Sequence, residues 1–123
     1  SELDTAVARL KDNTGLRLTL ALNYGGRQEI VDSVNKALSA GAKTIDEESI
    51  ARGLYTSDLP ELDLVIRTSG EMRISNFLLW QAAYAELYVT PVLWPDFRRE
   101  HLAAALADFA QRDRRFGGLT AKP

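Results

Sequence analysis

The sequence has no cysteine and a single histidine, His101, among its 123 residues. The missing thiols exclude disulfides, thiolate nucleophiles and cysteine-based zinc sites, and one histidine cannot build a histidine metal cluster. No apolar run approaches the ~20 residues of a membrane-spanning helix, and the chain shows no secretory signal pattern. Neither charge sign dominates, since 15 basic and 17 acidic residues give a net charge of −2. We expect a soluble, cytoplasmic protein that binds no nucleic acid.

Apolar residues make up 46% of the chain, and their spacing predicts its secondary structure. Helical spacing predicts helices over residues 3–10, 27–40, 47–54, 75–86 and about 97–109. Alternating or continuous apolar residues predict strands over residues 16–22, 62–66 and 87–94. Gly41 suits the end of the second helix, while Asp46 and Asp96 are expected to cap the starts of the third and the last.

Helices that alternate with strands indicate an α/β fold with a mostly parallel sheet flanked by helices. Sheets average ~5–6 strands and a parallel sheet needs cover on both faces, whereas only three strands are predicted here. We therefore expect that N-terminal strands are missing from this chain and that it forms part of a domain. The helix predicted over 75–86 is apolar on nearly every side, which indicates burial within the protein or against a partner subunit.

Two arginines stand between the strand over 62–66 and the helix predicted to follow it. Arg67 comes directly after the strand, where ligands collect in open parallel sheets, and Arg73 and Ser75 precede the helix. Guanidinium groups, a hydroxyl and a helix N-terminus all favour a phosphate, so a diphosphate is the natural occupant. In the alternative interpretation Ser75 merely caps the helix, and both arginines pair with acids nearby, namely Glu61, Asp63 or Glu71.

Glu86, the lone acid at the end of the predicted helix 75–86, is either a metal ligand or a salt-bridged end residue. Eleven residues of helix span ~16 Å. Glu86 would therefore reach a phosphate held at Ser75 only if the helix broke or another subunit supplied one of the two. The two glycines of "NYGGR" suit a structural turn, because the longer glycine spacing of nucleotide loops is missing.

Four segments taken together resemble the C-terminal half of the undecaprenyl diphosphate synthases, which are cis-prenyltransferases. These segments are "NYGGR", "DLVIRTSGEMRISNFLLWQAAYAELY", "LWPDF" and "RRFGG", and the resemblance spans about residues 13–119. It implies that residues 1–123 form the C-terminal half of a single cis-prenyltransferase domain. The implied reaction adds isopentenyl diphosphate to an allylic diphosphate such as farnesyl diphosphate, with Mg²⁺ and cis geometry. Its product is the lipid carrier for cell-wall synthesis.

The resemblance also implies roles for particular residues. Those that match the isopentenyl diphosphate site are Arg67, Arg73, Ile74 and Ser75. Glu86 matches a Mg²⁺ ligand, and Arg115 and Gly117 match an R-x-G element that reaches the diphosphate site across a homodimer. Met72 stands where some relatives carry histidine. Peripheral association with a membrane for product release is part of the same expectation.

The D-G-N-x-R loop and the S-x-E-N-W segment of the family's N-terminal half do not occur in these residues. The resemblance assigns the allylic diphosphate and the catalytic aspartate to that half. We therefore expect no catalytic residue in this chain and no turnover by the chain alone. Two other functions stay open at this point, a non-catalytic partner subunit of a cis-prenyltransferase and an isolated phosphate-binding module.

Overall fold

The structure is a computed structural model that describes residues 1–115. Within these residues the elements are α1 (Glu2–Leu10), α2 (Gly26–Ser39), α3 (Glu47–Gly53), β1 (Leu64–Arg67), η1 (Gln81–Tyr84), β2 (Glu86–Val89), η2 (Trp94–Asp96) and α4 (Arg99–Ala110), η denoting a 3-10 helix. α1, α2, α3 and α4 confirm four of the five predicted helices. β1 and β2 confirm two of the three predicted strands, both shorter than expected.

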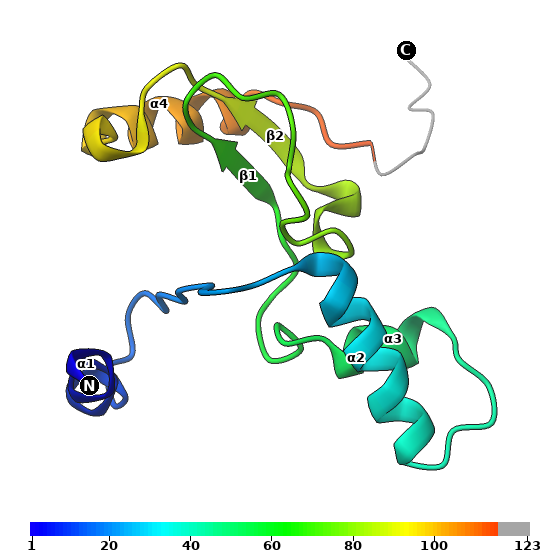
Figure 1. Ribbon diagram of the computed structural model, residues 1–123. Helices are drawn as coiled ribbons and strands as arrows, with labels where there is room; N and C mark the ends of the chain where they lie inside the picture. The colour runs from blue at the N-terminus through cyan, green and yellow to red at the C-terminus, as the bar shows by residue number, and fades with distance from the viewer. Residues whose placement is uncertain (116–123) are drawn as a thin grey trace.

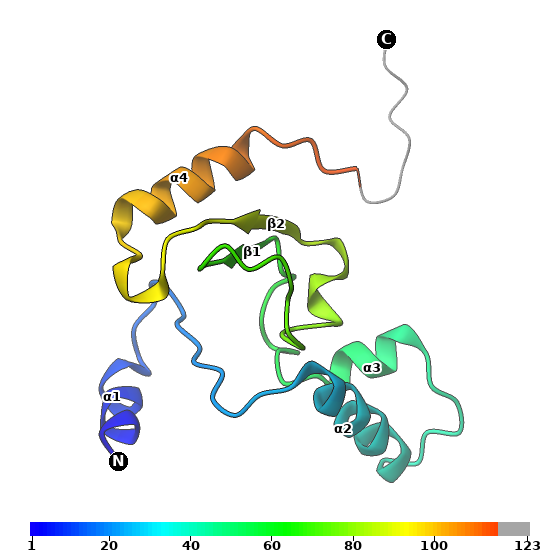
Figure 2. The same cartoon turned by 45° about the horizontal axis from the view of Figure 1, so that its top comes forward.

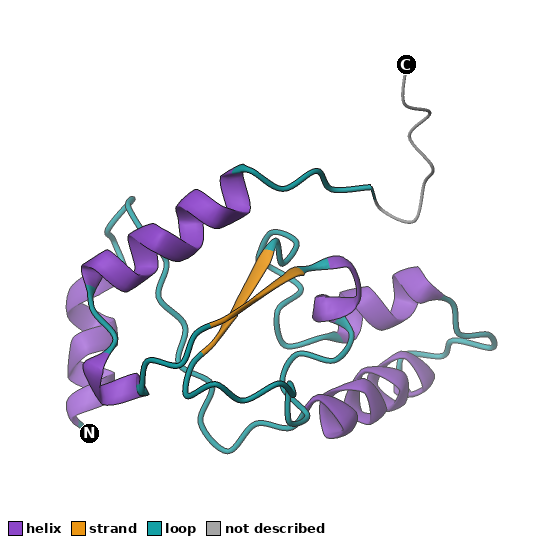
Figure 3. Ribbon diagram, turned by 90° about the horizontal axis from the view of Figure 1, so that it is seen from above, coloured by secondary structure: helices purple, strands orange, loops and turns teal. Residues whose placement is uncertain are grey.

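β1 and β2 form a parallel pair, as predicted, with Leu64 opposite Glu86 and Arg67 opposite Val89. The ladder continues one residue beyond β2, because the Thr90 N–H donates to the Arg67 carbonyl at 2.9 Å. The two strands lie between α4 and the pair α2–α3 (Figures 1 and 3). The Arg112 guanidinium, just after α4, donates to the Leu87 carbonyl at 3.0 Å and so ties the end of that helix to β2.

α2 and α3 pack directly against each other. The Ser33 hydroxyl of α2 donates to the Ile50 carbonyl of α3 at 2.6 Å. A Cβ at Gly53 would lie 2.1 Å from the Ser33 Oγ, so only glycine allows this approach. Glu29 and Ser33, both on α2, are fully buried. A polar stripe of α2 thus forms much of its contact with the rest of the chain.

The strand predicted over residues 16–22 is wrong. These residues pair with no strand in the described part of the chain, although Arg17 forms an ion pair with Asp58 at 2.9 Å. α1 lies apart from the helix pair α2–α3 (Figure 2). The leucines at 16, 18, 20 and 22 are exposed, Leu16 by 94%. Alternation predicts which face of a strand is apolar, but a strand also needs a neighbour for its N–H and carbonyl groups. β1 and β2 pair only with each other here.

The helix predicted over residues 75–86 is also wrong. Ser75, Asn76 and Leu78 have positive φ angles of 48°, 64° and 46°, which lie in the left-handed region and cannot continue a right-handed helix. Only the short η1 forms within this segment. Glu86 consequently opens β2 instead of ending a helix, and Ser75 has no helix to cap.

Asp96 does not cap the last helix, which corrects a further expectation. Asp96 belongs to η2, and the N-cap of α4 is Arg98. The Arg98 N–H donates to the His101 Nδ1 at 2.9 Å. A histidine nitrogen therefore performs the reciprocal half of a capping box that a carboxylate usually supplies.

Candidate functional site

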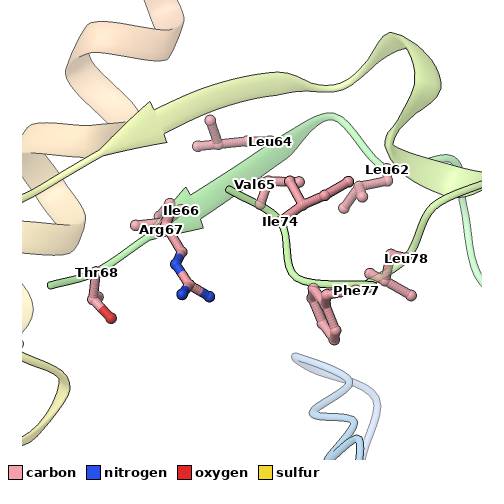
Figure 4. A pocket seen from close by; sticks show the side chains of 9 residues that line it. All are labelled: Leu62, Leu64, Val65, Ile66, Arg67, Thr68, Ile74, Phe77 and Leu78. Atoms are coloured by element: carbon pink, nitrogen blue, oxygen red, sulfur yellow. The ribbon is translucent and has the colours of Figure 1, made fainter. Parts of the chain in front are cut away.

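A cavity of about 280 Å³ opens beside β1, and Figure 4 shows it at close range. β1 with its flanking residues and the segment after Arg73 provide its lining, namely Leu62, Leu64, Val65, Ile66, Arg67, Thr68, Ile74, Phe77 and Leu78. Seven of these nine side chains are hydrocarbon. The cavity thus joins an apolar wall to one cation and one hydroxyl, which suits a ligand with a charged group and an apolar tail.

Arg67 is the last residue of β1, and its guanidinium points away from the strand into the cavity (Figure 4). Its Nε is buried and has no hydrogen-bond partner within residues 1–115. A buried donor without an acceptor costs about 1–3 kcal/mol. An anion that accepted from this Nε would recover that cost, so the position favours an anionic ligand.

The loop after Arg67 holds this end of the strand in place. Ser69 and Gly70 both have a φ of 66°, so the chain turns sharply there. The Ser69 N–H donates to the Val92 carbonyl at 2.9 Å, and the Gly70 N–H donates to the Thr90 carbonyl at 2.8 Å. The loop that follows Arg67 is therefore hydrogen-bonded to the residues that follow β2.

Arg73 and Ser75 do not line the cavity, although Ile74 between them does. The Arg73 guanidinium forms an ion pair with Glu71 and is 65% exposed, so for Arg73 this structure shows the alternative pairing considered above. Exposed ion pairs contribute only about 0–1 kcal/mol. A diphosphate could therefore displace Glu71 at little cost.

Glu86 lies away from Arg67. It stands opposite Leu64, three residues before the position opposite Arg67, which corresponds to ~10 Å along a parallel strand. Its carboxylate accepts from Arg112 at 2.8 Å. Hydrogen bonds from Arg112 to Glu86, and then to Asp108, raise the pKa of the Arg112 guanidinium above its ordinary value, so Arg112 remains a cation beside this carboxylate.

The described residues do not by themselves form a Mg²⁺ site. No group of three or more acidic, histidine or cysteine side chains among them could hold a metal ion. Mg²⁺ is commonly bound by one or two carboxylates together with phosphate oxygens. Glu86 would have to leave Arg112 to serve as one of these, and its role as a metal ligand stays a prediction.

Of the predicted R-x-G element, only Arg115 falls within the described residues. It is exposed, and its Nε lies 3.8 Å from an Asp113 carboxylate oxygen. Gly117 lies outside the described part of the chain. The preceding Arg114 forms an ion pair with Asp63 and lies over the Phe109 ring, 5.9 Å from its centroid. This segment therefore reaches back to the strand pair through Arg112 and Arg114.

Sequence reasoning missed the buried Glu29. Its carboxylate accepts from the Tyr24 hydroxyl, from the Tyr55 N–H at 2.8 Å and from the Gln81 Nε2 at 3.1 Å to each oxygen. Desolvation, followed by the bond to Glu29, raises the pKa of the Tyr24 hydroxyl. Glu29 thereby links α2, the end of α3 and η1. A signal was present in the helical spacing of the polar residues Glu29 and Ser33 with the small Gly26, but the sequence did not identify their partners.

Comparison with known proteins agrees with this architecture. The model of the family described as "Putative undecaprenyl diphosphate synthase" matches residues 1–117. An isoprenyl transferase from Heliobacterium mobile is 53% identical over 124 residues, which cover 96% of this chain and 48% of that protein. The chain thus spans about half the length of this relative.

In the described residues, no helix is long and apolar enough to cross a membrane.

Two solved structures share the fold. Lavandulyl diphosphate synthase from Lavandula x intermedia, crystallised with dimethylallyl diphosphate, has a TM-score of 0.83 and 37% identity, covering 93% of this chain and 52% of that one. A "probable undecaprenyl diphosphate synthase" from Campylobacter jejuni has a TM-score of 0.79 and 32% identity, covering 94% and 54%. This chain therefore has part of the cis-prenyltransferase fold. The chain belongs to the undecaprenyl diphosphate synthase family of isoprenyl transferases.

Proposed function

We propose that this chain supplies the isopentenyl diphosphate site of an isoprenyl transferase. The enzyme would condense isopentenyl diphosphate onto an allylic diphosphate with cis geometry, giving undecaprenyl diphosphate or a similar polyprenyl diphosphate. In this proposal residues 1–123 form one half of the catalytic domain. The allylic diphosphate and the catalytic aspartate then belong to the half that this chain does not contain.

The observation that carries the proposal is the Arg67 Nε, buried in a mainly apolar cavity with no acceptor within residues 1–115. Isopentenyl diphosphate joins a diphosphate to a short hydrocarbon tail, so one end suits the guanidinium and the other the apolar wall. The lavandulyl diphosphate synthase structure contains dimethylallyl diphosphate. A related fold thus binds a short prenyl diphosphate, which supports prenyl diphosphates as the class of ligand.

The remaining site residues have supporting roles in the proposal. Arg73 would exchange Glu71 for a phosphate oxygen, and the exposed Ser75 would add a hydroxyl donor. Glu86 is proposed as a Mg²⁺ ligand together with groups from outside residues 1–115. Arg115 and Gly117 would act on the site of the second subunit in a homodimer.

The test uses an assembled enzyme, defined as this chain joined to the half of the Heliobacterium mobile isoprenyl transferase that it does not match. Arg67→Ala should remove a charge-assisted bond of about 1.5–3 kcal/mol, which raises the KM for isopentenyl diphosphate by one to two powers of ten. The KM for the allylic diphosphate should stay nearly constant, because that substrate contacts the other half.

The matched control is Arg99→Ala, which removes an exposed arginine at the start of α4 and should leave both constants unchanged. An equal rise in both KM values, or a loss of stability alone, would show that Arg67 is structural. Full activity of the Arg67→Ala enzyme would instead favour a non-catalytic role for this half.

A further inference from the structure

We propose that Asn76 is a positioning residue that fixes the segment Arg73–Ser75 by capping α2 from across the fold. This inference rests on the proposed function, because that segment is a proposed part of the isopentenyl diphosphate site. Asn76 itself neither lines the cavity at Arg67 nor belongs to the residues assigned above to the diphosphate.

The start of α2 lacks a cap of its own. The first four N–H groups of a helix have no partner inside it, and a side chain at the N-cap usually accepts from one of them. The N-cap of α2 is Gly25, which has no side chain. Instead the Gly26 N–H donates to the Asn76 carbonyl at 2.7 Å, and the Arg27 N–H donates to the Asn76 Oδ1 at 2.9 Å. One residue from a distant loop thus satisfies two N–H groups of the helix.

The same two bonds hold a strained backbone. Asn76 has a φ of 64°, and Ser75 before it has a φ of 48°. The left-handed region costs an ordinary residue roughly 1–2 kcal/mol, and asparagine is among the residues that adopt it most readily. Two successive left-handed residues direct the chain so that Ile74 faces the cavity while Ser75 is exposed. The cap on α2 therefore stabilises the conformation of the anion-binding segment.

Close contact leaves this junction little freedom. A Cβ at Gly26 would lie 2.9 Å from the Leu79 Cγ and 3.1 Å from the Asn76 carbonyl oxygen. The Tyr24 ring meets the Phe77 ring edge-on, with 5.7 Å between centroids. The start of α2 thus contacts the loop leading to η1 at Asn76 and at two residues that follow it, Phe77 and Leu79. The two segments lie side by side in Figure 1. A shift of α2 would be passed directly to Ser75.

Three substitutions in the assembled enzyme separate the parts of this role. Asn76→Asp keeps an oxygen acceptor and a residue that tolerates positive φ, so its KM for isopentenyl diphosphate should stay within about twofold of the parent. Asn76→Gly keeps the backbone conformation but loses the side-chain bond, and Asn76→Ala loses both. The KM for isopentenyl diphosphate should rise roughly three- to tenfold in the Gly variant, as expected for one lost hydrogen bond, and further in the Ala variant.

Positioning and general structural roles predict different results. A positioning role moves the KM for isopentenyl diphosphate, spares the KM for the allylic diphosphate and is rescued by aspartate. An unchanged KM in Asn76→Gly would overturn the proposal, as would an Asp variant as impaired as the Gly variant. If Asn76→Ala does not fold, the Gly and Asp variants decide the question.

Arg67→Ala, measured in parallel, separates the two proposals. If Arg67→Ala raises the KM for isopentenyl diphosphate and Asn76→Gly does not, only the role of Asn76 is refuted. If Arg67→Ala leaves that KM unchanged, the proposed function fails, and the inference that rests on it fails with it.

Discussion

Replacing Glu29 by glutamine should destabilise the fold although the two side chains have nearly the same shape. Glu29 is fully buried and accepts from three donors on three segments. These donors are the Tyr24 hydroxyl, the Tyr55 N–H and the Gln81 amide. Glutamine keeps one oxygen and replaces the other with an NH₂ group. That group would face donors where an acceptor is needed.

The expected loss follows from the charge of the acceptor. Hydrogen bonds to a charged group contribute about 1.5–3 kcal/mol each, against about 0.5–1.5 kcal/mol for neutral pairs. Weakening two of these hydrogen bonds and losing the third would cost more than about 3 kcal/mol. Glutamine is neutral, so the variant avoids the desolvation cost of a buried charge, which offsets part of this loss. We expect a net loss of about 2 kcal/mol in the free energy of unfolding.

Urea denaturation followed by circular dichroism measures this loss, provided that the slope of the transition does not change. Glu47→Gln is the matched control, because Glu47 is exposed in the first turn of α3 and surface substitutions usually change stability by less than about 0.5 kcal/mol. Equal midpoints for the two variants would refute the account of Glu29 as the residue that links the three segments.

Two further predictions concern the same region. Gly53→Ala places a Cβ 2.1 Å from the Ser33 Oγ, which should force α3 from α2 and cost about 1–3 kcal/mol. Gly15→Ala is the control, because a Cβ at Gly15 would have no atom within 4 Å, and it should not lower the melting temperature. Equal melting temperatures for the Gly53→Ala and Gly15→Ala variants would contradict the packing of α3 against α2. The pKa of Tyr24 is raised above its ordinary value of 10.0 by burial and by Glu29. The stability that this shift contributes is therefore complete below about pH 10 and is lost as the pH rises further. Melting temperatures measured across that range should fall more steeply for the parent than for Tyr24→Phe, and parallel curves would show that Tyr24 makes no such contribution.

Local signals were enough to predict most helices and the parallel strand pair. Gly41, with a φ of 92°, ends α2 as its position predicted. The Asp46 carboxylate accepts from the Ser49 N–H at 2.8 Å and starts α3. Such caps involve residues within one turn, so the sequence displays both partners.

The failures arise where distant residues decide the structure. Residues 75–86 have a helical pattern, but the left-handed backbone at Asn76 is stabilised by bonds to the start of α2, 49 residues away in sequence. The apolar alternation over 16–22 could not show that no described strand would pair with it. A long-range contact overrides the local pattern in residues 75–86, whereas residues 16–22 have no described strand to pair with.

The site residues also divide into those that local sequence predicted and those whose partners are distant in sequence. Arg67 was predicted from its place directly after a strand, and it lines the cavity. Its neighbour Arg73 pairs with Glu71, two residues away, an interaction that the sequence offered as an alternative. Glu29 could not be identified because Tyr55 and Gln81 lie 26 and 52 residues from it.

The most direct test of the proposed site observes the Arg67 Nε–Hε resonance in the ¹⁵N-labelled assembled enzyme, assigned by its loss in Arg67→Lys. A charge-assisted bond from this Nε to a phosphate oxygen should move the resonance downfield and slow its exchange when isopentenyl diphosphate is added. Arg99, exposed on α4, provides the internal control and should not respond. An Arg67 resonance that stays unchanged while isopentenyl diphosphate saturates the enzyme would contradict the assignment of this cavity to the diphosphate.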